Sequence, residues 1–248
     1  MMRECEGRPG MTIPWLDERD PFPPVESALG DPNGLIAAGD DLSPERLVDA
    51  YARGIFPWFG DDDPVLWWSP DPRMVLQPRD LHVSRSLRRA IRSARYAVTL
   101  DAAFPHVVAG CAEPRDAEGG TWITAGMAAA YNRLAALGFA HSVEVWAGDT
   151  LVGGLYGVAL GRMFYAESMF SRRRDASKIA LVYLVRQLER WGFELVDCQM
   201  FTTHLASLGA REISRTEFLQ FVDRLARLPA VPSPWALAPD LEEIVRVK

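Results

Sequence analysis

Hydrophobic positions form two strand-like stretches with a helical stretch between them in the second half of the chain. Residues 162–168 and 193–199 have the pattern of buried strands, and residues 175–191 repeat apolar positions at helical spacing until Gly192. A strand, a helix and a strand in this order predict a right-handed crossover to a parallel neighbour. The carboxyl ends of both strands then lie at one edge of the sheet, where open α/β sheets bind ligands.

The rest of the pattern predicts two unequal parts. Residues 1–72, rich in Pro, Gly and aromatic residues, predict a small N-terminal lobe with one helix capped by Ser43. Residues 73–248 predict a larger domain that ends in a Pro-rich tail, which we expect to wrap the surface. Its expected elements are strands at 73–77, 96–100, 140–147 and 150–159, and helices after Ser84, Asp101, Thr124 and Ser214.

Short connections at Gly148-Asp149 and Leu160-Gly161 predict a three-strand meander before the crossover. A meander, a helix and a parallel strand resemble the core of the N-acetyltransferase-like fold. We therefore predict an α+β protein with a mixed, N-acetyltransferase-like (GNAT-type) sheet, flanking helices and a small N-terminal lobe. The fold does not name the reaction.

Composition and charge exclude several classes of protein. No run of 18 apolar residues predicts a transmembrane helix, and a net charge of −6 argues against a general nucleic-acid coat protein. The polar stretch Met1 to Gly10 lacks the apolar segment of a secretion signal. The widely spaced Cys5, Cys111 and Cys198 predict neither a disulfide framework nor a zinc site. We expect a cytoplasmic protein that does not contact membranes.

Polar side chains at the two strand ends are the first candidates for chemistry. Glu167, Asp197 and Gln199 lie where buried strands finish, and polar groups are costly to bury without a partner or a role. Asp197 and Gln199 share strand parity, so both are expected to face one side of the sheet. A helix cap or an ion pair with an arginine is the simpler explanation for each of them. Cys198, of opposite parity, is more typical of a core cysteine than of a nucleophile.

One predicted helix presents a basic face. Arg85, Arg88, Arg89 and Arg92 recur at helical spacing, and no acidic residue alternates with them on that face. Like charges four residues apart are destabilising. A phosphate partner and an ordinary solvated face are equally compatible with this pattern.

Aromatic residues are crowded near Trp58, and Trp122 lies between two threonines. Packing within the small lobe explains most of them, but such rings also stack on nucleobases. Common nucleotide-binding and zinc-protease motifs are absent.

Several short stretches occur in order between about residues 20 and 220. They include Tyr51-Ala-Arg-Gly-Ile-Phe-Pro-Trp, Leu66-Trp-Trp-Ser-Pro-Asp-Pro-Arg, Gly120-Thr-Trp-Ile-Thr, Glu167-Ser-Met-Phe-Ser and Asp197-Cys-Gln. Together they resemble the leucyl/phenylalanyl-tRNA–protein transferase family. The resemblance implies transfer of Leu or Phe, and less readily Met, from aminoacyl-tRNA to an N-terminal Arg or Lys of a protein. It also implies products that enter N-degron-dependent degradation. We expect no cofactor, because the donor ester is already activated, and we expect a monomer.

The resemblance also implies roles for individual residues. Glu167 would orient the acceptor, and Asp197 and Gln199 would activate or position the attacking amine. Our own prediction for this pair is that Asp197 polarises Gln199, whose side-chain oxygen accepts from the amine. Residues implied near the terminal adenosine or the aminoacyl group are Tyr51, Trp58 and Trp122. Residues implied in the pocket for the amino-acid side chain are Leu155, Phe164, Leu181, Leu184 and Val196. Residues implied to contact the tRNA acceptor stem are Arg85, Arg88, Arg89 and Arg92.

Phe164 and Glu167 have opposite strand parity, and a bulge between them is one way for both to serve one site. Residues 200–203 depart from the family, which often has a polar residue there. Two alternatives stay open. An acyl-CoA-dependent acetyltransferase would need a Gly-containing loop that residues 168–175 lack, and a non-catalytic tRNA-binding module would need only the arginines and tryptophans.

Overall fold

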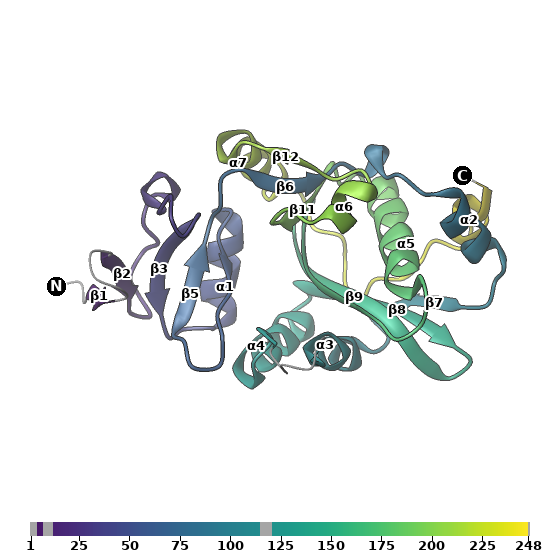
Figure 1. The fold of residues 1–248 in the computed structure, drawn as a ribbon, viewed down its shortest axis with the longest axis horizontal. Helices are drawn as coiled ribbons and strands as arrows, with labels where there is room; N and C mark the ends of the chain where they lie inside the picture. Colours follow the sequence, from purple (N-terminus) through teal and green to yellow (C-terminus); the bar gives the residue numbers. More distant parts are fainter. Residues whose placement is uncertain (1–3, 7–11, 115–120, 248) are drawn as a thin grey trace.

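Two β-sheets organise the residues that the computed structural model describes, which are 4–6, 12–114 and 121–247. The first sheet has the order β1-β2-β3-β5-β4, and the second has the order β12-β6-β11-β10-β9-β8-β7 (Figure 1). The strands of the first sheet are β1 Glu4–Glu6, β2 Thr12–Leu16, β3 Leu35–Gly39, β4 Phe56–Pro57 and β5 Val65–Trp68. The strands of the second are β6 Arg73–Leu76, β7 Ala97–Leu100, β8 Ala140–Ala147, β9 Thr150–Leu160, β10 Met163–Ser171, β11 Leu195–Gln199 and β12 Arg211–Ile213.

The α-helices flank these sheets, and hydroxyl caps fix where several of them begin. They are α1 Pro44–Ala52, α2 Arg85–Arg92, α3 Phe104–Ala112, α4 Ala125–Ala136, α5 Ala176–Arg190, α6 Thr203–Ser207, α7 Arg215–Leu225 and α8 Leu241–Val247. Ser43, Ser84, Thr124 and Ser214 each accept a hydrogen bond from a backbone N–H in the first turn, as predicted.

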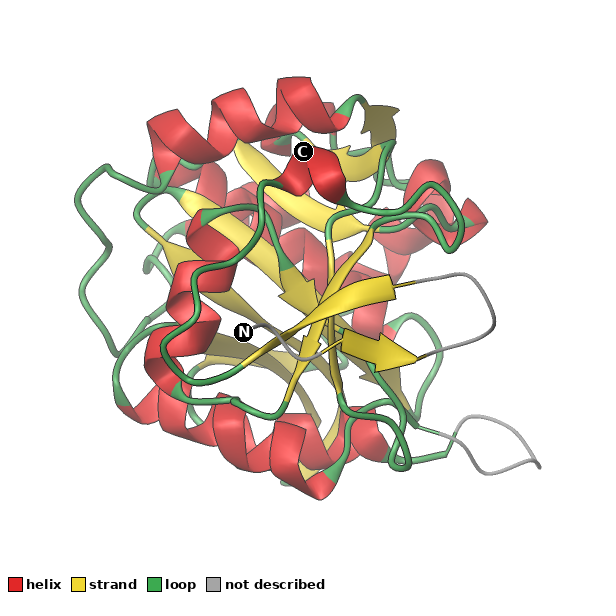
Figure 2. Cartoon of the chain, turned by 90° about the vertical axis from the view of Figure 1, so that its left-hand side faces the viewer, coloured by secondary structure: helices red, strands yellow, loops and turns green. Residues whose placement is uncertain are grey.

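The predicted crossover is confirmed. Strands β8, β9 and β10 form an antiparallel meander, and α5 then leads to β11, which pairs with β10 in parallel. Figure 1 shows α5 on one side of β8 and β9, and α3 and α4 on the other. Seen from the N-terminal side, strands run through the middle of the molecule with helices above and below (Figure 2). The predicted α+β class, a mixed sheet with flanking helices, is therefore confirmed.

Each face of the second sheet has its own hydrophobic cluster. One cluster joins α3, α4 and α7 to the first sheet and α1, through residues such as Tyr51, Tyr131 and Phe218. The other joins α2, α5 and the C-terminal segment, through residues such as Leu87, Leu181 and Trp235. The first of these clusters therefore joins the two sheets, and it brings side chains of α1 to the second sheet.

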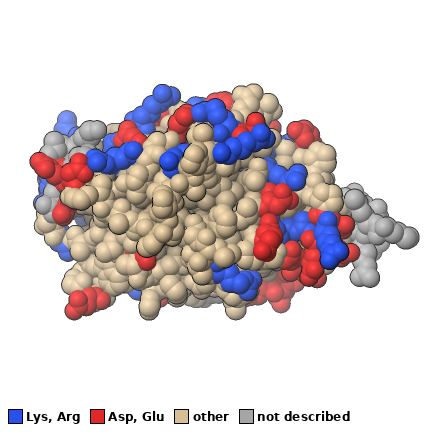
Figure 3. Space-filling view, turned by 180° about the vertical axis from the view of Figure 1, so that it is seen from behind, with Lys and Arg blue, Asp and Glu red and all other residues tan. Residues whose placement is uncertain are grey.

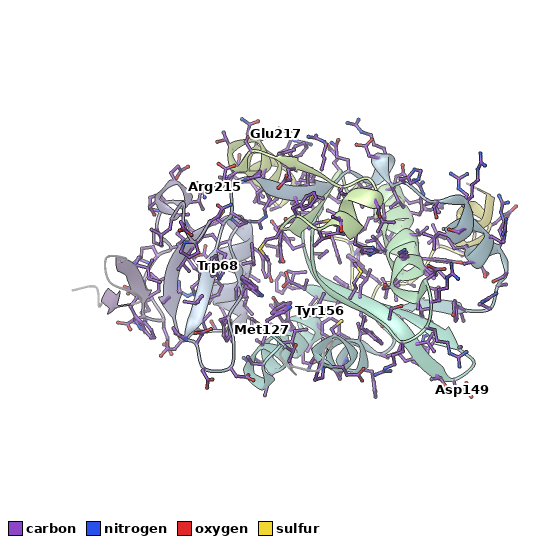
Figure 4. All side chains as sticks on the ribbon, in the orientation of Figure 1. Trp68, Met127, Asp149, Tyr156, Arg215 and Glu217 are labelled. Carbon is purple, nitrogen blue, oxygen red and sulfur yellow. The ribbon has the colours of Figure 1, made fainter. Side chains whose placement is uncertain are left out.

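The N-terminus of α7 also ties the two sheets together. Arg215 donates to the carbonyl of Ser69 at 2.6 Å and its backbone N–H donates to Asp71 at 3.0 Å, so it holds the short connection between β5 and β6. Figure 4 labels Arg215 at this connection.

Two local predictions were wrong. Asp101 does not cap α3, because the N-cap is Ala103; Asp101 instead accepts from His141, the backbone of Ser142 and the backbone of Trp235. The tail is more than a surface wrap. Trp235 is buried with its ring stacked on His141 at 3.5 Å, and Leu241 of α8 is fully buried. The tail is too short for the spacing of its hydrophobic residues to predict that it packs into the core.

Candidate functional site

A β-bulge places Glu167 at the centre of the site. The register between β10 and β9 shifts between Ala166 and Ser168, so Glu167 is the extra residue in β10. A bulge is therefore present between Phe164 and Glu167, although Phe164 does not line the cavity described below. The expectation that Glu167 ends its strand was wrong, because β10 continues to Ser171.

Three side chains hydrogen-bond to the carboxyl group of Glu167. Tyr51 donates to Oε1 at 2.7 Å, Tyr131 donates to Oε2 at 2.6 Å, and Nε2 of Gln199 donates to Oε1 at 3.0 Å. Burial raises the pKa of Glu167 to about 7, while the hydrogen bonds from the two tyrosines lower it. The pKa of Glu167 therefore lies near neutral pH, far above the ordinary pKa of a glutamate.

A second bulge positions Gln199. The register between β11 and β6 shifts between Asp197 and Gln199, and Gln199 has a left-handed φ of 62°. A side chain other than glycine rarely adopts that conformation, which costs on the order of 1–2 kcal/mol. The backbone N–H of Gln199 donates to Oδ1 of Asp197 at 2.9 Å, which stabilises the turned backbone. The side chain of Gln199 is thereby directed at Glu167.

Asp197 is held by a buried arginine. Nε and Nη2 of Arg73 donate to its two oxygens at 2.8 and 2.6 Å, and neither side chain is exposed. The guanidinium also donates to the carbonyl of Gly54 and lies between the rings of Phe56 and Phe218, at 4.7 and 4.5 Å.

The expected contact of Asp197 with the side chain of Gln199 is not made. The bulge turns the main chain of Gln199 toward Asp197, so the parity argument that put both side chains on one side fails. Asp197 reaches the site through the backbone of Gln199.

A cavity of about 440 Å³ lies beside Glu167 and Gln199. Six of the expected site residues line it: Trp58, Trp122, Leu155, Glu167, Leu181 and Gln199. Its wall is mostly apolar, with the acid and the amide among the few polar groups, which is typical of a small-molecule site.

Five other expected residues do not line this cavity. Phe164, Leu184 and Val196 belong to the same buried cluster as Leu155 and Leu181, so they lie in the hydrophobic layer behind the wall. Tyr51 and Asp197 are buried and act through their hydrogen bonds to Glu167 and Gln199.

The four arginines of α2 lie on its exposed face, opposite the buried Leu87 and Ile91. Arg89 also lines a separate pocket of about 270 Å³, together with Ser86, Arg95, Tyr96, Arg174 and Asp175. Three guanidinium groups and one carboxylate, that of Asp175 paired with Arg174 at 3.6 Å, thus border one small cavity with a surplus of positive charge. Such an arrangement suits an anion with several oxygens.

Two important residues were missed by sequence reasoning. Tyr131 was expected only as a member of a helix, and Arg73 only as the start of a strand. Neither residue type carries a local signal, because each acts on a partner far away in the sequence: Tyr131 on Glu167 and Arg73 on Asp197. Among the described residues, no three His, Cys, Asp or Glu side chains form a group that could hold a metal ion. Nor is any described helix long and apolar enough to cross a membrane.

Comparison with known proteins identifies close relatives of the sequence. Residues 75–223 match the family model described as leucyl/phenylalanyl-tRNA protein transferase, and residues 40–71 match the model of the N-terminal domain of the same family. A leucyl/phenylalanyl-tRNA–protein transferase of Nitrosospira multiformis is 60% identical over 223 residues, covering 90% of this chain and 96% of the relative. The one from Thiobacillus denitrificans is 60% identical over 214 residues, covering 86% and 94%.

Solved structures give only loose matches. L-PGS from Bacillus licheniformis superposes with a TM-score of 0.37 at 11% identity, covering 69% of this chain and 57% of that one. A GCN5-related N-acetyltransferase from Kribbella flavida superposes with a TM-score of 0.36 at 14% identity, covering 73% and 65%. Neither likeness is close enough to bear on function.

Proposed function

The chain belongs to the leucyl/phenylalanyl-tRNA–protein transferase family, and from this premise we infer that it transfers leucine or phenylalanine from aminoacyl-tRNA to a protein. The acceptor is an N-terminal Arg or Lys, and the product is a new peptide bond. The observation that carries this proposal is the mostly apolar cavity of about 440 Å³ whose polar groups include Glu167 and Gln199.

The cavity suits the donor side chain. Leu155 and Leu181 on its wall would contact an isobutyl or benzyl group, and Phe164, Leu184 and Val196 would support that wall from behind. An apolar pocket separates side chains that differ by one methylene by only about 1–3 kcal/mol. Methionine, which is flexible and apolar, is therefore proposed as a slower donor.

The reaction requires orientation of the two substrates more than chemical activation of either one. The free α-amine of the acceptor attacks the carbonyl carbon of the aminoacyl ester, the amide bond forms, and the ester bond to the ribose breaks. The proton lost by the amine ends on the released ribose hydroxyl. An α-amine has a pKa of about 7.7–8.0, so part of it is neutral at pH 7 and attacks without a strong base. Positioning is then the main contribution of the protein.

Gln199 and Glu167 are proposed to hold that amine. Because Nε2 of Gln199 donates to Glu167, its Oε1 is the atom that can accept a hydrogen bond from the nucleophile. Trp58 and Trp122 would contact the terminal adenosine or the ester, since their indole rings line the same cavity. Asp197 and Tyr51 are positioning residues in this scheme.

The tRNA backbone is proposed to lie along α2. Arg85, Arg88, Arg89 and Arg92 supply cations, and the pocket between Arg89, Arg95 and Arg174 could receive one phosphate. Phosphate contacts would add affinity without reading sequence. The opposite face of the molecule from that in Figure 1 has few charged side chains across its middle, although Lys and Arg gather along its upper edge, so the middle of that face offers little to a polyanion (Figure 3).

The finer features follow from the same premise. We propose that the chain acts as a monomer in the cytoplasm and that its products enter an N-degron pathway. We also propose a boundary between a small lobe and the catalytic domain at residues 72 and 73. The separate sheets before and after this point, and the two family models that meet near it, support that boundary.

One assay tests the proposal. Purified protein is mixed with tRNA charged with labelled leucine and with a peptide that begins with Arg, and label in the peptide is measured. Transfer to this peptide, and none to the same peptide with an acetylated N-terminus, is expected. Absence of transfer from both Leu-tRNA and Phe-tRNA would refute the assignment. A protein that bound the charged tRNA without transfer would instead be a tRNA-binding module.

A further inference from the structure

The C-terminal segment is anchored beside the elements that form the donor cavity. Residues 229–247 follow α7 and include α8, which packs on α2 and α5 (Figure 1). The backbone N–H of Trp235 donates to Asp101 at 2.7 Å, and that of Ala238 donates to the buried Gln187 of α5 at 2.8 Å. Backbone hydrogen bonds to two separate parts of the domain therefore fix the position of Trp235. The transfer reaction proposed above gives this segment no role.

Trp235 contributes the volume of its ring to the core. The side chain is 3% exposed, and its ring is stacked on His141 of β8. The ring of Phe164 on β10 lies 6.0 Å away, measured between centroids. Nε1 of Trp235 has no hydrogen-bond partner among the described residues. A buried donor without a partner costs free energy, so the contribution of this side chain comes from the contacts of its ring.

Phe164 connects Trp235 to the wall of the donor cavity. A Cβ atom at Gly157 would lie 2.6 Å from the ring of Phe164, so this ring occupies the space that a side chain would need. Gly157 is two residues from Leu155 on β9, and the two positions share a face of the sheet. Phe164 shares that face with Ala166, because the register shift in β10 comes only after Ala166. Leu155 and Ala166 line the cavity, so Phe164 lies one layer behind its wall and Trp235 lies behind Phe164.

This packing limits how far a donor side chain can enter the cavity. Protein interiors are packed as densely as organic crystals, so one ring can be displaced only if its neighbours move. Trp235 backs the ring of Phe164, and the hydrogen bond to Asp101 holds Trp235 in place. The depth available to an isobutyl or benzyl group therefore depends on a residue that touches neither group.

We propose that Trp235 is a positioning residue that sets the depth of the donor pocket and thereby its relative preference for leucine and phenylalanine. It acts through Phe164, which it keeps against the strand that carries Leu155. The inference rests on the proposed transfer reaction and assigns part of its donor selectivity to the C-terminal segment. A residue beyond the matched family model, which ends at residue 223, thus takes part in the choice of substrate.

The test measures donor preference with one tRNA that is charged with either leucine or phenylalanine, so that the two donors differ only in the side chain. The ratio of their kcat/KM values is determined with a single acceptor peptide that begins with Arg. Trp235→Leu lets Phe164 retreat and should raise the Phe-to-Leu ratio about fivefold, since one methylene in an apolar pocket changes such a ratio about 10–200-fold and this change is one layer removed. KM for the acceptor peptide should not change.

Two further variants separate donor selectivity from loss of stability. Trp235→Phe keeps an aromatic ring and removes no hydrogen bond, so it leaves a smaller cavity and should raise the same ratio about twofold. Trp191→Leu is the matched control, because the ring of Trp191 meets that of Trp235 at 4.9 Å and has no described ring contact with Phe164. Chemical denaturation should show a loss of stability in this control, with an unchanged donor ratio. An equal shift of the ratio in the control would overturn the proposal.

A double-mutant cycle tests the route through Phe164. Phe164→Leu should itself change the donor ratio, and Trp235→Leu should add little to that change, because residues in contact are coupled. If the two changes multiply, Trp235 does not act through Phe164 and the proposal is wrong.

An unchanged Phe-to-Leu ratio in both Trp235 variants would make Trp235 a core anchor only. That result would overturn the inference although wild-type transfer stands. If wild-type protein transferred neither leucine nor phenylalanine, the proposed function itself would fail. The two failures are therefore distinguishable in one assay.

Discussion

Arginines occupy two contrasting environments in this protein. Arg73 is fully buried, donates to both oxygens of Asp197 and lies between two phenylalanine rings. Arg85, Arg88 and Arg89 are exposed on α2 and pair with no carboxylate among the described side chains. A buried guanidinium fixes the positions of the groups that it contacts, because packing holds each of these partners in one place. A row of exposed guanidiniums attracts an anion through its combined electrostatic field. The exact position of each side chain then matters little, whereas the ionic strength matters greatly.

The largest effect is expected from Arg73→Ala. Removing it leaves Asp197 as an unpaired buried charge, which costs about 3–5 kcal/mol of the free energy of unfolding. Chemical denaturation measures this, and Arg53→Ala is the control. Arg53 forms an exposed pair with Asp49 at 2.8 Å, where such a pair contributes at most about 1 kcal/mol. Equal losses in both variants would contradict the distinction between the two environments.

Gln199→Ala should lower kcat by about 100-fold, the order expected when a nucleophile loses its positioning group. The fold and the dissociation constant for tRNA should be preserved, since the side chain lies at the cavity rim and is partly exposed. Single-turnover transfer and a filter-binding assay separate the two quantities. A matching rise in the dissociation constant would make Gln199 a tRNA-binding residue instead.

Charge reversal at Arg88 and Arg89 tests the exposed field. The double variant Arg88→Glu, Arg89→Glu should weaken tRNA binding at low salt and reduce the slope of log K against log salt by about 1 for each phosphate that is no longer neutralised. Turnover at saturating tRNA should stay near that of wild type. An unchanged slope would mean that this face of α2 is only solvated surface.

A further, pH-dependent effect concerns the charge of Glu167. Its pKa is raised from 4.5 to about 7, so the folded protein holds this proton more tightly than the unfolded chain does. The contribution of Glu167 to stability is therefore present below pH 4.5 and is lost as the pH rises to about 7. Relative to Glu167→Gln, wild type should lose free energy of unfolding across this window. A constant difference between the two proteins would show that the pKa is not raised.

Local patterns predicted the fold well because most of its determinants are local. Helix caps at Ser43, Thr124 and Ser214 depend on neighbouring backbone, and the meander depends on short turns at Gly148 and Gly161. The site was only partly predictable. Glu167 and Gln199 do meet, at 3.0 Å, but the supporting Tyr131 and Arg73 come from distant segments with no sequence signal. The bulge in β11 also reversed the parity expected for Asp197 and Gln199.

Tyr51, whose hydroxyl donates a hydrogen bond to Glu167, belongs to α1, whereas Glu167 belongs to the second sheet. Arg73 likewise donates to the carbonyl of Gly54, just beyond the same helix. In a truncated protein that began at β6, Glu167 would therefore lack one hydrogen-bond donor and the guanidinium of Arg73 would lack one acceptor. Complementation in trans by a separate piece carrying α1 would have to rebuild those two interactions before any turnover returned.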